Sequence, residues 1–290
     1  MTQIISALSE ISDTYDAMFV DLWGCVHDGI KALPDAVAAL QAYRQRGGAV
    51  VLLTNAPRAR NEIAKQLEKF GVPADAYDTI ATSGDSARAA MFRGAVGRKV
   101  WFIGQPHDLS FFDPLHLVDD PVEIIQVELD EAEGIVCCGP EDPHADPDVM
   151  RPAFLKAKTK GLPLLCANPD IIVDRGDQRE WCAGALARLY TEMGGESLYF
   201  GKPYPPIYDL ARRRLAELGK DVADSRILAV GDGVLTDIQG AMGEDIDSLF
   251  ISGGIAAEET KTSHQPDESA LKTYLSKEQV SPTYTIGQLR

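Results

Sequence analysis

Short apolar runs alternate with amphipathic stretches along most of this chain. Residues 49–53 and 227–231 are continuous apolar runs, and residues 249–252 are an apolar run that ends in Ser252; such runs are typical of strands that are buried on both faces of a sheet. Residues 34–47 and 205–219 have helical spacing, with proline near the start and glycine at the end. The alternation predicts an α/β fold in which successive βα units build a parallel sheet.

Weaker signals extend this pattern through the middle of the chain. We expect a helix over about residues 58–70 and strands at residues 99–103, 134–138, 162–167 and 197–200. The run at residues 249–252 is expected to be the last strand of the main sheet. Residues 141–148 carry several acidic groups and two prolines. They could form a metal cluster, but a solvated loop is favoured because proline and aspartate are turn formers.

Composition narrows the classes of protein to which the chain can belong. Its 290 residues are 45% hydrophobic, enough for a substantial core in one large or two moderate domains. A formal net charge of −16 argues against a nucleic-acid polymer as partner. We see no signal peptide and no apolar stretch of about 20 residues, so we expect a cytoplasmic protein that does not enter the membrane. Five scattered cysteines without CxxC spacing predict reduced thiols.

Two acidic turns lie far apart in the chain, and each follows an apolar run. Asp21 ends the run Phe19-Val20, and Asp232 follows the run at residues 227–231. In an open parallel sheet, ligands bind outside the carboxyl ends of the strands. Both carboxylates are therefore predicted at one mouth, where they would attract a divalent cation suited to phosphoryl transfer.

Five motifs in order resemble the haloacid dehalogenase superfamily, and specifically its class IIA, NagD-like phosphatases. They are Val-His-Asp-Gly at 26–29, Leu-Thr-Asn at 53–55, Asn-Pro-Asp at 168–170, Gly-Lys-Pro at 201–203, and Gly-Asp at 231–232 running on to residues 237–241. The resemblance implies a Rossmann-like core with a parallel sheet, formed by residues 1–82 and 197–290. Residues 83–196 would form an inserted α/β cap domain.

The resemblance also implies catalytic roles. Asp21 would be the nucleophile that forms an aspartyl-phosphate, which splits hydrolysis into two steps. The implied cofactor is Mg²⁺, which prefers oxygen ligands and needs only one or two carboxylates. By analogy with the family, Asp21, Asp232 and the backbone carbonyl of Trp23 would bind it. Asp237 would lie in a second shell or bind through water.

Further positions would hold the phosphoryl group or the rest of the substrate. Lys202 would neutralise phosphoryl oxygens, while the Thr54 hydroxyl and the Asn55 backbone N–H would bind them. Gly24 would let the chain pass close to the anion. The remaining substrate-binding candidates are Arg58, Asn168 and Asp170. Structural alternatives stay open: Thr54 as a helix cap, Arg58 at a helix start, and Asn168 and Asp170 as turn residues.

One position departs from the family pattern. The usual first motif has a second aspartate two residues after the nucleophile, which acts as general acid and then as general base; here that residue is Trp23. An indole cannot protonate a leaving oxygen, so catalysis should lose the ~10²–10⁴-fold that general acid–base help supplies. His27 could replace the missing acid, although a role in shaping the adjoining loop is favoured.

The resulting prediction is a phosphatase that hydrolyses a small phosphorylated metabolite such as a sugar phosphate, a nucleotide or pyridoxal phosphate. That substrate range comes from the family resemblance. Two alternatives remain: a degenerate protein that binds a phosphorylated ligand or a partner with little turnover, and an enzyme that cleaves a phosphonate or a carbon–halogen bond. A homodimer formed through the cap is a further expectation from the resemblance.

Overall fold

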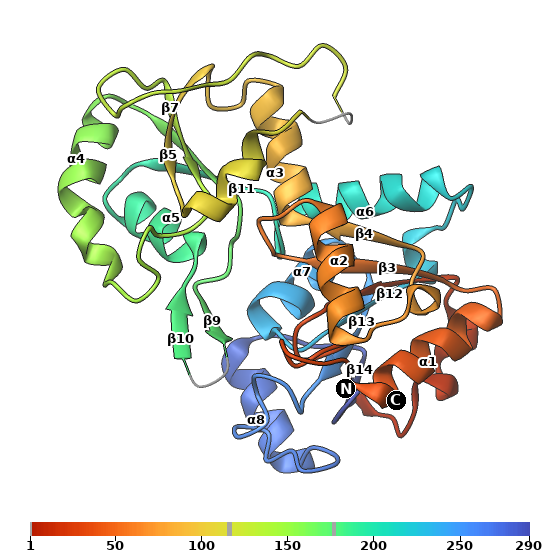
Figure 1. Cartoon of the computed structure of the whole chain (residues 1–290). Coiled ribbons are helices and arrows are strands. Elements are labelled where there is room, and N and C mark those ends of the chain that lie inside the picture. The colour runs from red at the N-terminus through yellow and green to blue at the C-terminus, as the bar shows by residue number, and fades with distance from the viewer. Residues whose placement is uncertain (1, 115–117, 176–177) are drawn as a thin grey trace. The chain divides into compact units, whose positions relative to one another are not determined.

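The computed structural model divides into two compact units, each continuous in space but not in sequence (Figure 1). It describes residues 2–114, 118–175 and 178–290. The core unit comprises Met1–Thr54, Asn61–Ala81 and Lys202–Arg290. The inserted unit comprises Asn55–Arg60 and Thr82–Gly201. Each unit is described below by itself.

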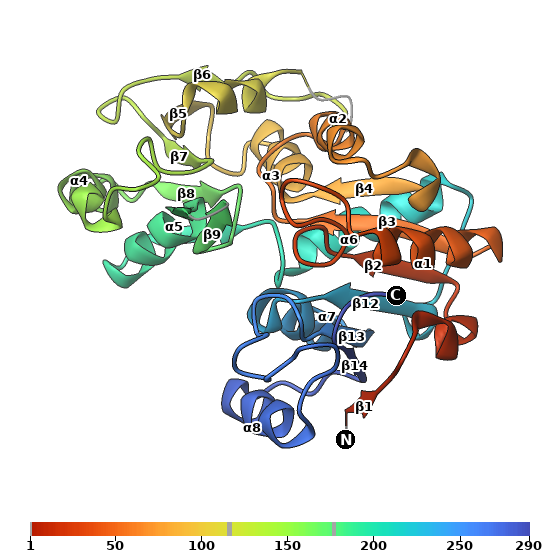
Figure 2. The same cartoon turned by 60° about the horizontal axis from the view of Figure 1, so that its bottom comes forward.

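A seven-stranded sheet forms the centre of the core unit, and Figure 2 shows its strands from top to bottom. In spatial order, starting from that end, these are β4 (Thr79–Thr82), β3 (Ala49–Thr54), β2 (Ala17–Val20), β12 (Ile227–Gly231), β13 (Asp247–Ile251), β14 (Tyr284–Ile286) and β1 (Gln3–Ile4). The pairings from β3 to β1 are all parallel. The prediction of an α/β fold with a parallel sheet is confirmed.

Every residue of β2, β3 and β12 is buried, as expected for strands covered on both faces. On one face, Phe19 and Val51 pack against Ile207 and Leu210 of α6 in a shared apolar cluster. The helices of this unit are α1 (Pro34–Gln45), α2 (Arg60–Phe70), α6 (Pro205–Glu217), α7 (Gln239–Gly243) and α8 (Glu268–Glu278). Because both faces are covered, ligands can reach these central strands only at their ends.

The inserted unit has a five-stranded sheet and an apolar core of its own. In spatial order the strands are β11 (Glu196–Tyr199), β8 (Pro163–Cys166), β7 (Gly134–Cys137), β5 (Lys99–Ile103) and β6 (Ile125–Gln126), and the unit also contains the hairpin β9 (Ile172–Arg175) and β10 (Gln178–Trp181). Its helices are α3 (Ser83–Phe92), α4 (Arg151–Thr159) and α5 (Ala183–Glu192). The expected start of the second core segment is residue 197, whereas β11 pairs in parallel with β8 of the inserted unit.

Most of the expected elements are present, but the prediction for the end of the main sheet is wrong. β13 is not the last strand, because β14 pairs with it on the side away from β12. The three residues of β14 lie between Pro282 and Gly287, so they give too short an apolar run to be recognised in the sequence. The acidic stretch at 141–148 is a loop that runs into a short 3₁₀ helix at Pro147–Met150.

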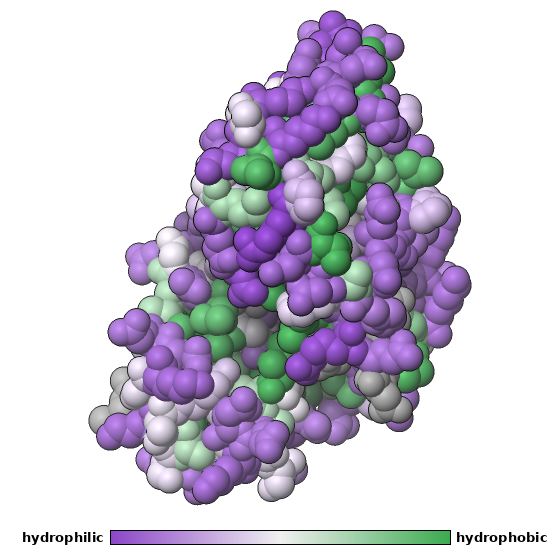
Figure 3. Space-filling model, turned by 90° about the vertical axis from the view of Figure 1, so that its left-hand side faces the viewer, coloured by the Kyte–Doolittle hydropathy of each residue, from purple (hydrophilic) through white to green (hydrophobic). Residues whose placement is uncertain are grey.

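One face of the molecule is mostly hydrophilic. Hydrophilic side chains cover most of the face shown in Figure 3, and hydrophobic ones form smaller groups between them. Over the described part of the chain, every helix is too short or too polar to cross a bilayer.

Candidate active site

Parallel pairing brings three of the predicted site residues to one edge of the core sheet. Val20 of β2 is level with Val230 of β12 and with Leu52 of β3. Asp21 and Asp232 therefore follow the carboxyl ends of adjacent strands, and Thr54 is the last residue of the third. The backbone N–H of Asp21 donates to the Val230 carbonyl at 2.8 Å, which keeps the first turn against β12.

A buried lysine joins two of the carboxylates at this edge. Lys202 Nζ lies 2.5 Å from Asp21 Oδ1 and 2.6 Å from Asp237 Oδ1, with only 3% of the lysine exposed. Burial alone would lower the pKa of Lys202. The charges of Asp21 and Asp237, together with their hydrogen bonds, instead raise it well above its usual value. The ammonium is thus retained as a positive charge beside Asp21.

Asp237 is oriented by the turn that follows β12. Val234–Ile238 forms one π-helical turn before α7, and the Asp237 side chain folds back on the preceding loop. Its Oδ2 accepts from the Gly233 N–H at 3.0 Å while its Oδ1 accepts from Lys202. Burial raises the pKa of Asp237 to about 6, although the positive charge of Lys202 acts to lower it. Direct metal ligation would compete with both hydrogen bonds, so a role in a second shell remains the prediction.

The residues around Asp232 fit a divalent cation. Its Oδ2 accepts from the Ile255 N–H at 3.0 Å, and a Cβ on Gly24 or Gly254 would lie 2.3 or 2.1 Å from the same oxygen. Gly24 has a φ of +72°, a conformation that favours glycine. Burial, and then the charges of Asp21 and Asp237, raise the pKa of Asp232 well above its usual value. A bound cation would relieve this crowding of negative charge.

Cys25 lies in the same cluster and was not predicted from the sequence. Its Sγ and carboxylate oxygens of Asp21 and Asp232 all lie within 4.8 Å of one another. Burial and the charges of Asp232 and Asp21 raise the pKa of the thiol well above its usual value. The sequence signal that could have identified Cys25 is its position four residues after Asp21 and directly after Gly24, in the turn that follows β2. The Gly254–Ile255 backbone beside Asp232 was missed too, although it follows β13 at the same edge of the sheet.

Trp23 and His27 pack together in the loop after β2. The indole lies against Gly29, where a Cβ would be 2.5 Å from the ring, and it meets the His27 ring edge-on at a centroid distance of 5.6 Å. His27 Nδ1 accepts from the Gly29 N–H at 3.0 Å, and the imidazole also packs on Phe70. Burial lowers the pKa of His27 to about 4. A neutral, packed imidazole favours the loop-shaping role over proton transfer.

Four candidate substrate-binding residues belong to the inserted unit. Asn55 Nδ2 donates to Asp170 Oδ1 at 2.8 Å, and the Asp170 N–H donates to Asn168 Oδ1 at 3.1 Å. Arg58 precedes α2, and its carbonyl oxygen would lie 2.7 Å from a Cβ on Gly84. The structure therefore brings Asn55, Asn168 and Asp170 together and places Arg58 in the segment packed on the start of α3.

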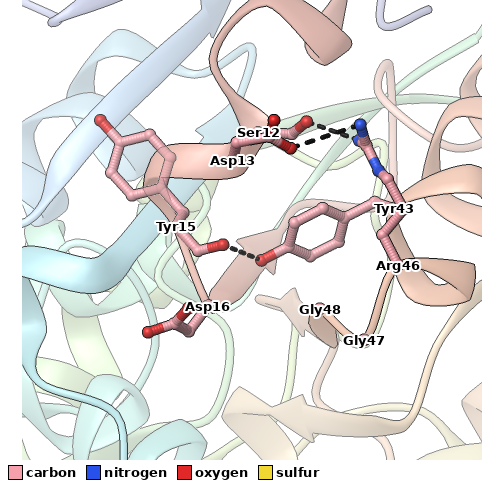
Figure 4. Close-up of a pocket in the computed structure, with 8 residues that line it drawn as sticks. All are labelled: Ser12, Asp13, Tyr15, Asp16, Tyr43, Arg46, Gly47 and Gly48. Atoms are coloured by element: carbon pink, nitrogen blue, oxygen red, sulfur yellow. Dashed lines mark hydrogen bonds and ion pairs between the residues drawn. The ribbon is translucent and has the colours of Figure 1, made fainter.

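A pocket of about 250 Å³ lies elsewhere in the core unit (Figure 4). Asp16 and Gly48 in its lining directly precede β2 and β3, so it is at the amino ends of strands whose carboxyl ends carry Asp21 and Thr54. Arg46 bonds Ser12 at one side of it. Ligands of open α/β sheets bind at the carboxyl ends. This pocket is therefore separate from the acidic cluster.

Comparison with known proteins identifies the family. A model described as haloacid dehalogenase-like hydrolase matches residues 18–117, and one described as HAD-hydrolase-like matches residues 199–274. A crystal structure of a haloacid dehalogenase-like hydrolase from Brucella suis 1330 is 38% identical, with a TM-score of 0.84, over 99% of this chain and 100% of that one. The chain belongs to the haloacid dehalogenase-like hydrolase family. The resemblance to this superfamily is therefore confirmed.

Relatives of this haloacid dehalogenase-like hydrolase include phosphatases. The 5'-nucleotidase YutF of Bacillus subtilis (strain 168) is 23% identical over 90% of this chain and 94% of its own length. The glycerol phosphate phosphatase Rv1692 of Mycobacterium tuberculosis was crystallised in complex with calcium. It is 23% identical, with a TM-score of 0.65, over 88% of this chain and 71% of that one. The comparison with Rv1692 shows that the two proteins share a fold.

Proposed function

We propose that this hydrolase is a magnesium-dependent phosphatase that acts on a small phosphorylated metabolite through an aspartyl-phosphate on Asp21. The observation that carries the proposal is the buried Lys202 ammonium, bonded to Asp21 at the edge of the sheet where Asp232 also lies. A nucleophilic carboxylate, a cation for the phosphoryl oxygens and a pair of metal-binding oxygens are the components that such a reaction needs.

The nucleophile is oriented before substrate binds. The Lys202 ammonium donates to both Asp21 Oδ1 and Asp237 Oδ1, so the nucleophilic carboxylate and the ammonium keep their relative position. A bound magnesium ion, held by Asp21, Asp232 and the carbonyl oxygen of Trp23, would neutralise charge on the phosphoryl oxygens. Thr54, at the end of β3, and the N–H of Asn55 would donate to the same group.

The reaction would proceed in two steps. An Asp21 oxygen attacks phosphorus, the bond from phosphorus to the ester oxygen breaks, and the alkoxide takes a proton from water, which leaves hydroxide. A second water hydrolyses the acyl phosphate, which restores the Asp21 carboxylate and releases inorganic phosphate and a proton that neutralises the hydroxide. Because Trp23 carries no acidic proton at its side chain, leaving groups that depart without protonation should react fastest.

The inserted unit would select the substrate. We propose that residues 83–196 act as a cap that excludes water and contacts the part of the substrate beyond the phosphate. Asn168, Asp170 and Arg58 would contribute to this contact, and a homodimer would form through the cap. The name of the 5'-nucleotidase relative supports a phosphomonoester as substrate, and the calcium-bound relative supports a divalent cation.

The test is phosphate release from a panel of phosphorylated metabolites and an aryl phosphate, with Mg²⁺ or with EDTA. Asp21→Asn should abolish release while retaining the fold. The matched control Asp221→Asn changes an exposed carboxylate of the core unit and should leave release unchanged. Release that persists in Asp21→Asn or in EDTA would refute the mechanism, and the ranking of substrates would define what the inserted unit selects.

Trp23 motivates a second candidate, a protein that binds a phosphorylated ligand with little turnover. The same panel distinguishes it. Magnesium-dependent binding of a panel compound, measured by calorimetry without phosphate release, would support the binding protein. Release of phosphate that depends on Asp21 would exclude it.

A further inference from the structure

A buried thiol lies against the carboxylates of the proposed metal site. Cys25 is 1% exposed, and its Sγ makes no hydrogen bond among the described residues. The sulfur and carboxylate oxygens of Asp21 and Asp232 lie within 4.8 Å of one another. This is the one group of at least three potential metal donors that the described part of the chain contains. The third donor of the cluster is therefore a sulfur atom.

The spacing suits a single ion. Donors at about 2.3 Å from a common ion can lie up to about 4.6 Å apart, so the three atoms need only small movements to share one. Gly24 and Gly254 confine Asp232 from two sides, and the Ile255 N–H holds its Oδ2. The carboxylate is thus kept close to the thiol.

Sulfur changes which cations this cluster prefers. Mg²⁺ is a hard ion that takes oxygen ligands, whereas thiolates select softer ions such as Zn²⁺. We propose that Asp21, Asp232 and Cys25 form a site for a thiophilic divalent cation of the Zn²⁺ or Cd²⁺ class, which competes with Mg²⁺. On binding, the Cys25 S–H bond breaks, the proton leaves to water, and a sulfur–metal bond forms.

The charges in this complex come close to balancing. Asp21, Asp232, Asp237 and the thiolate carry four negative charges. Lys202, which bonds both Asp21 and Asp237, offsets one of them, and a divalent cation offsets two, so one negative charge remains. Asp237 is held by Lys202 and Gly233, so it is not required as a ligand. This inference rests on the proposed function in one respect, namely that Mg²⁺ is the ion that usually occupies the site. Since the ion would occupy the Asp21 nucleophile, it should inhibit a phosphatase.

The experiment titrates the full-length protein with Cd²⁺ alone and follows the sulfur-to-cadmium charge-transfer band in the ultraviolet. Wild type should show a band that saturates at one ion per chain and is displaced by excess Mg²⁺. Loss of an outer-shell partner alone costs about 10–100-fold in metal affinity, so Cys25→Ser should lower the Cd²⁺ affinity by at least that factor and remove the band. The ratio of Cd²⁺ to Mg²⁺ affinity should fall accordingly.

The control is Cys138→Ser, which changes another buried thiol, in the inserted unit, and should keep the band. Circular dichroism checks the fold of each variant. Should Cys25→Ser fail to fold, Asp232→Asn provides a second test, because it keeps the thiol and removes one carboxylate. It should lower the Cd²⁺ affinity at least tenfold, since loss of an outer-shell partner alone costs about 10–100-fold.

Several results would overturn the proposal. Among them are a wild-type protein without the band, a band that survives Cys25→Ser, and a Cd²⁺ affinity that Asp232→Asn leaves unchanged. A band lost only in Cys138→Ser would assign the ion to thiols of the inserted unit and would also overturn it. Because the titration contains no substrate, a protein that binds Cd²⁺ through Cys25 but releases no phosphate would refute the proposed function alone.

Discussion

A methyl group added at Gly254 should disable the metal site without replacing any predicted ligand. In Gly254→Ala the new Cβ would lie 2.1 Å from Asp232 Oδ2 and 2.5 Å from Asp232 Cβ, where ordinary contacts are 3.4–4 Å. Because the contact includes Cβ as well as the carboxylate, rotation of the side chain cannot relieve it. Asp232 or the backbone of the loop must therefore move by roughly 1.3 Å, and misplacement by about 1 Å can cost ~10²-fold in rate.

We expect Gly254→Ala to lower Mg²⁺ affinity by about 10–100-fold, the range found when a metal ligand loses its support. Overpacking should also cost about 1–3 kcal/mol in the free energy of unfolding. Calorimetric titration with Mg²⁺ and urea unfolding measure the two effects separately. Gly243→Ala is the matched control, because its Cβ meets nothing within 4 Å. Wild-type Mg²⁺ affinity in Gly254→Ala would refute Asp232 as a ligand held in this position.

Three other substitutions probe the charges and rings of the site. Lys202→Met should destabilise the protein by about 3–5 kcal/mol in urea unfolding, because it removes the buried ammonium that bonds both Asp21 and Asp237. The pKa of His27 is lowered from 6.5 to about 4, so the stability that its neutral form contributes is complete above about pH 6.5 and falls as the pH drops toward about 4. Between about pH 7.5 and pH 5 the loss should be roughly 2 kcal/mol, and His27→Gln should abolish it. Trp23→Asp should raise the rate on alkyl phosphates more than on aryl phosphates, by up to ~10²–10⁴-fold.

Each of these expectations has an outcome that contradicts it. Lys202→Met should be compared with Lys272→Met, which removes an exposed lysine of α8; equal stabilities of the two variants would mean that the buried pairs contribute nothing. An unchanged pH slope in His27→Gln would assign the acid sensitivity to other groups. An equal change on both substrate classes would show that Trp23 serves packing and not the chemistry of the leaving group.

The central strands could be predicted because each is an uninterrupted apolar run. Burial on both faces removes the polar alternation that other strands show, so β3 and β12 stand out by composition alone. The edge strands lack this signal. β1 is only two residues long and exposed, and its pairing with β14 joins segments from opposite ends of the sequence. A partner so distant in the sequence leaves no local pattern to read.

The residues of the site, like the strands, could be predicted only in part from the sequence. Positions at strand ends could be inferred, since parallel strands place their carboxyl ends together, and this argument brought Asp21 and Asp232 to one edge. The sequence contains no comparable rule for loops. That Lys202 bonds both Asp21 and Asp237, and that Cys25 lies with the carboxylates, depends on how two turns fold back. Spacing along the chain does not determine these contacts.

The strand pairing of β2 also determines the order in which parts of the chain can fold during synthesis. Ala17 pairs with Ile227, so the central strand pair of the core unit cannot close until the whole inserted unit has left the ribosome. Thr82–Gly201 is a continuous segment with an apolar core of its own, and local contacts form before distant ones. We expect this segment to fold first. Until β12 emerges, β2 would have one unpaired edge, and apolar side chains of β2 and β3 would stay exposed. Exposed strand edges and apolar surface promote aggregation, so a chaperone should help the nascent chain most at this stage.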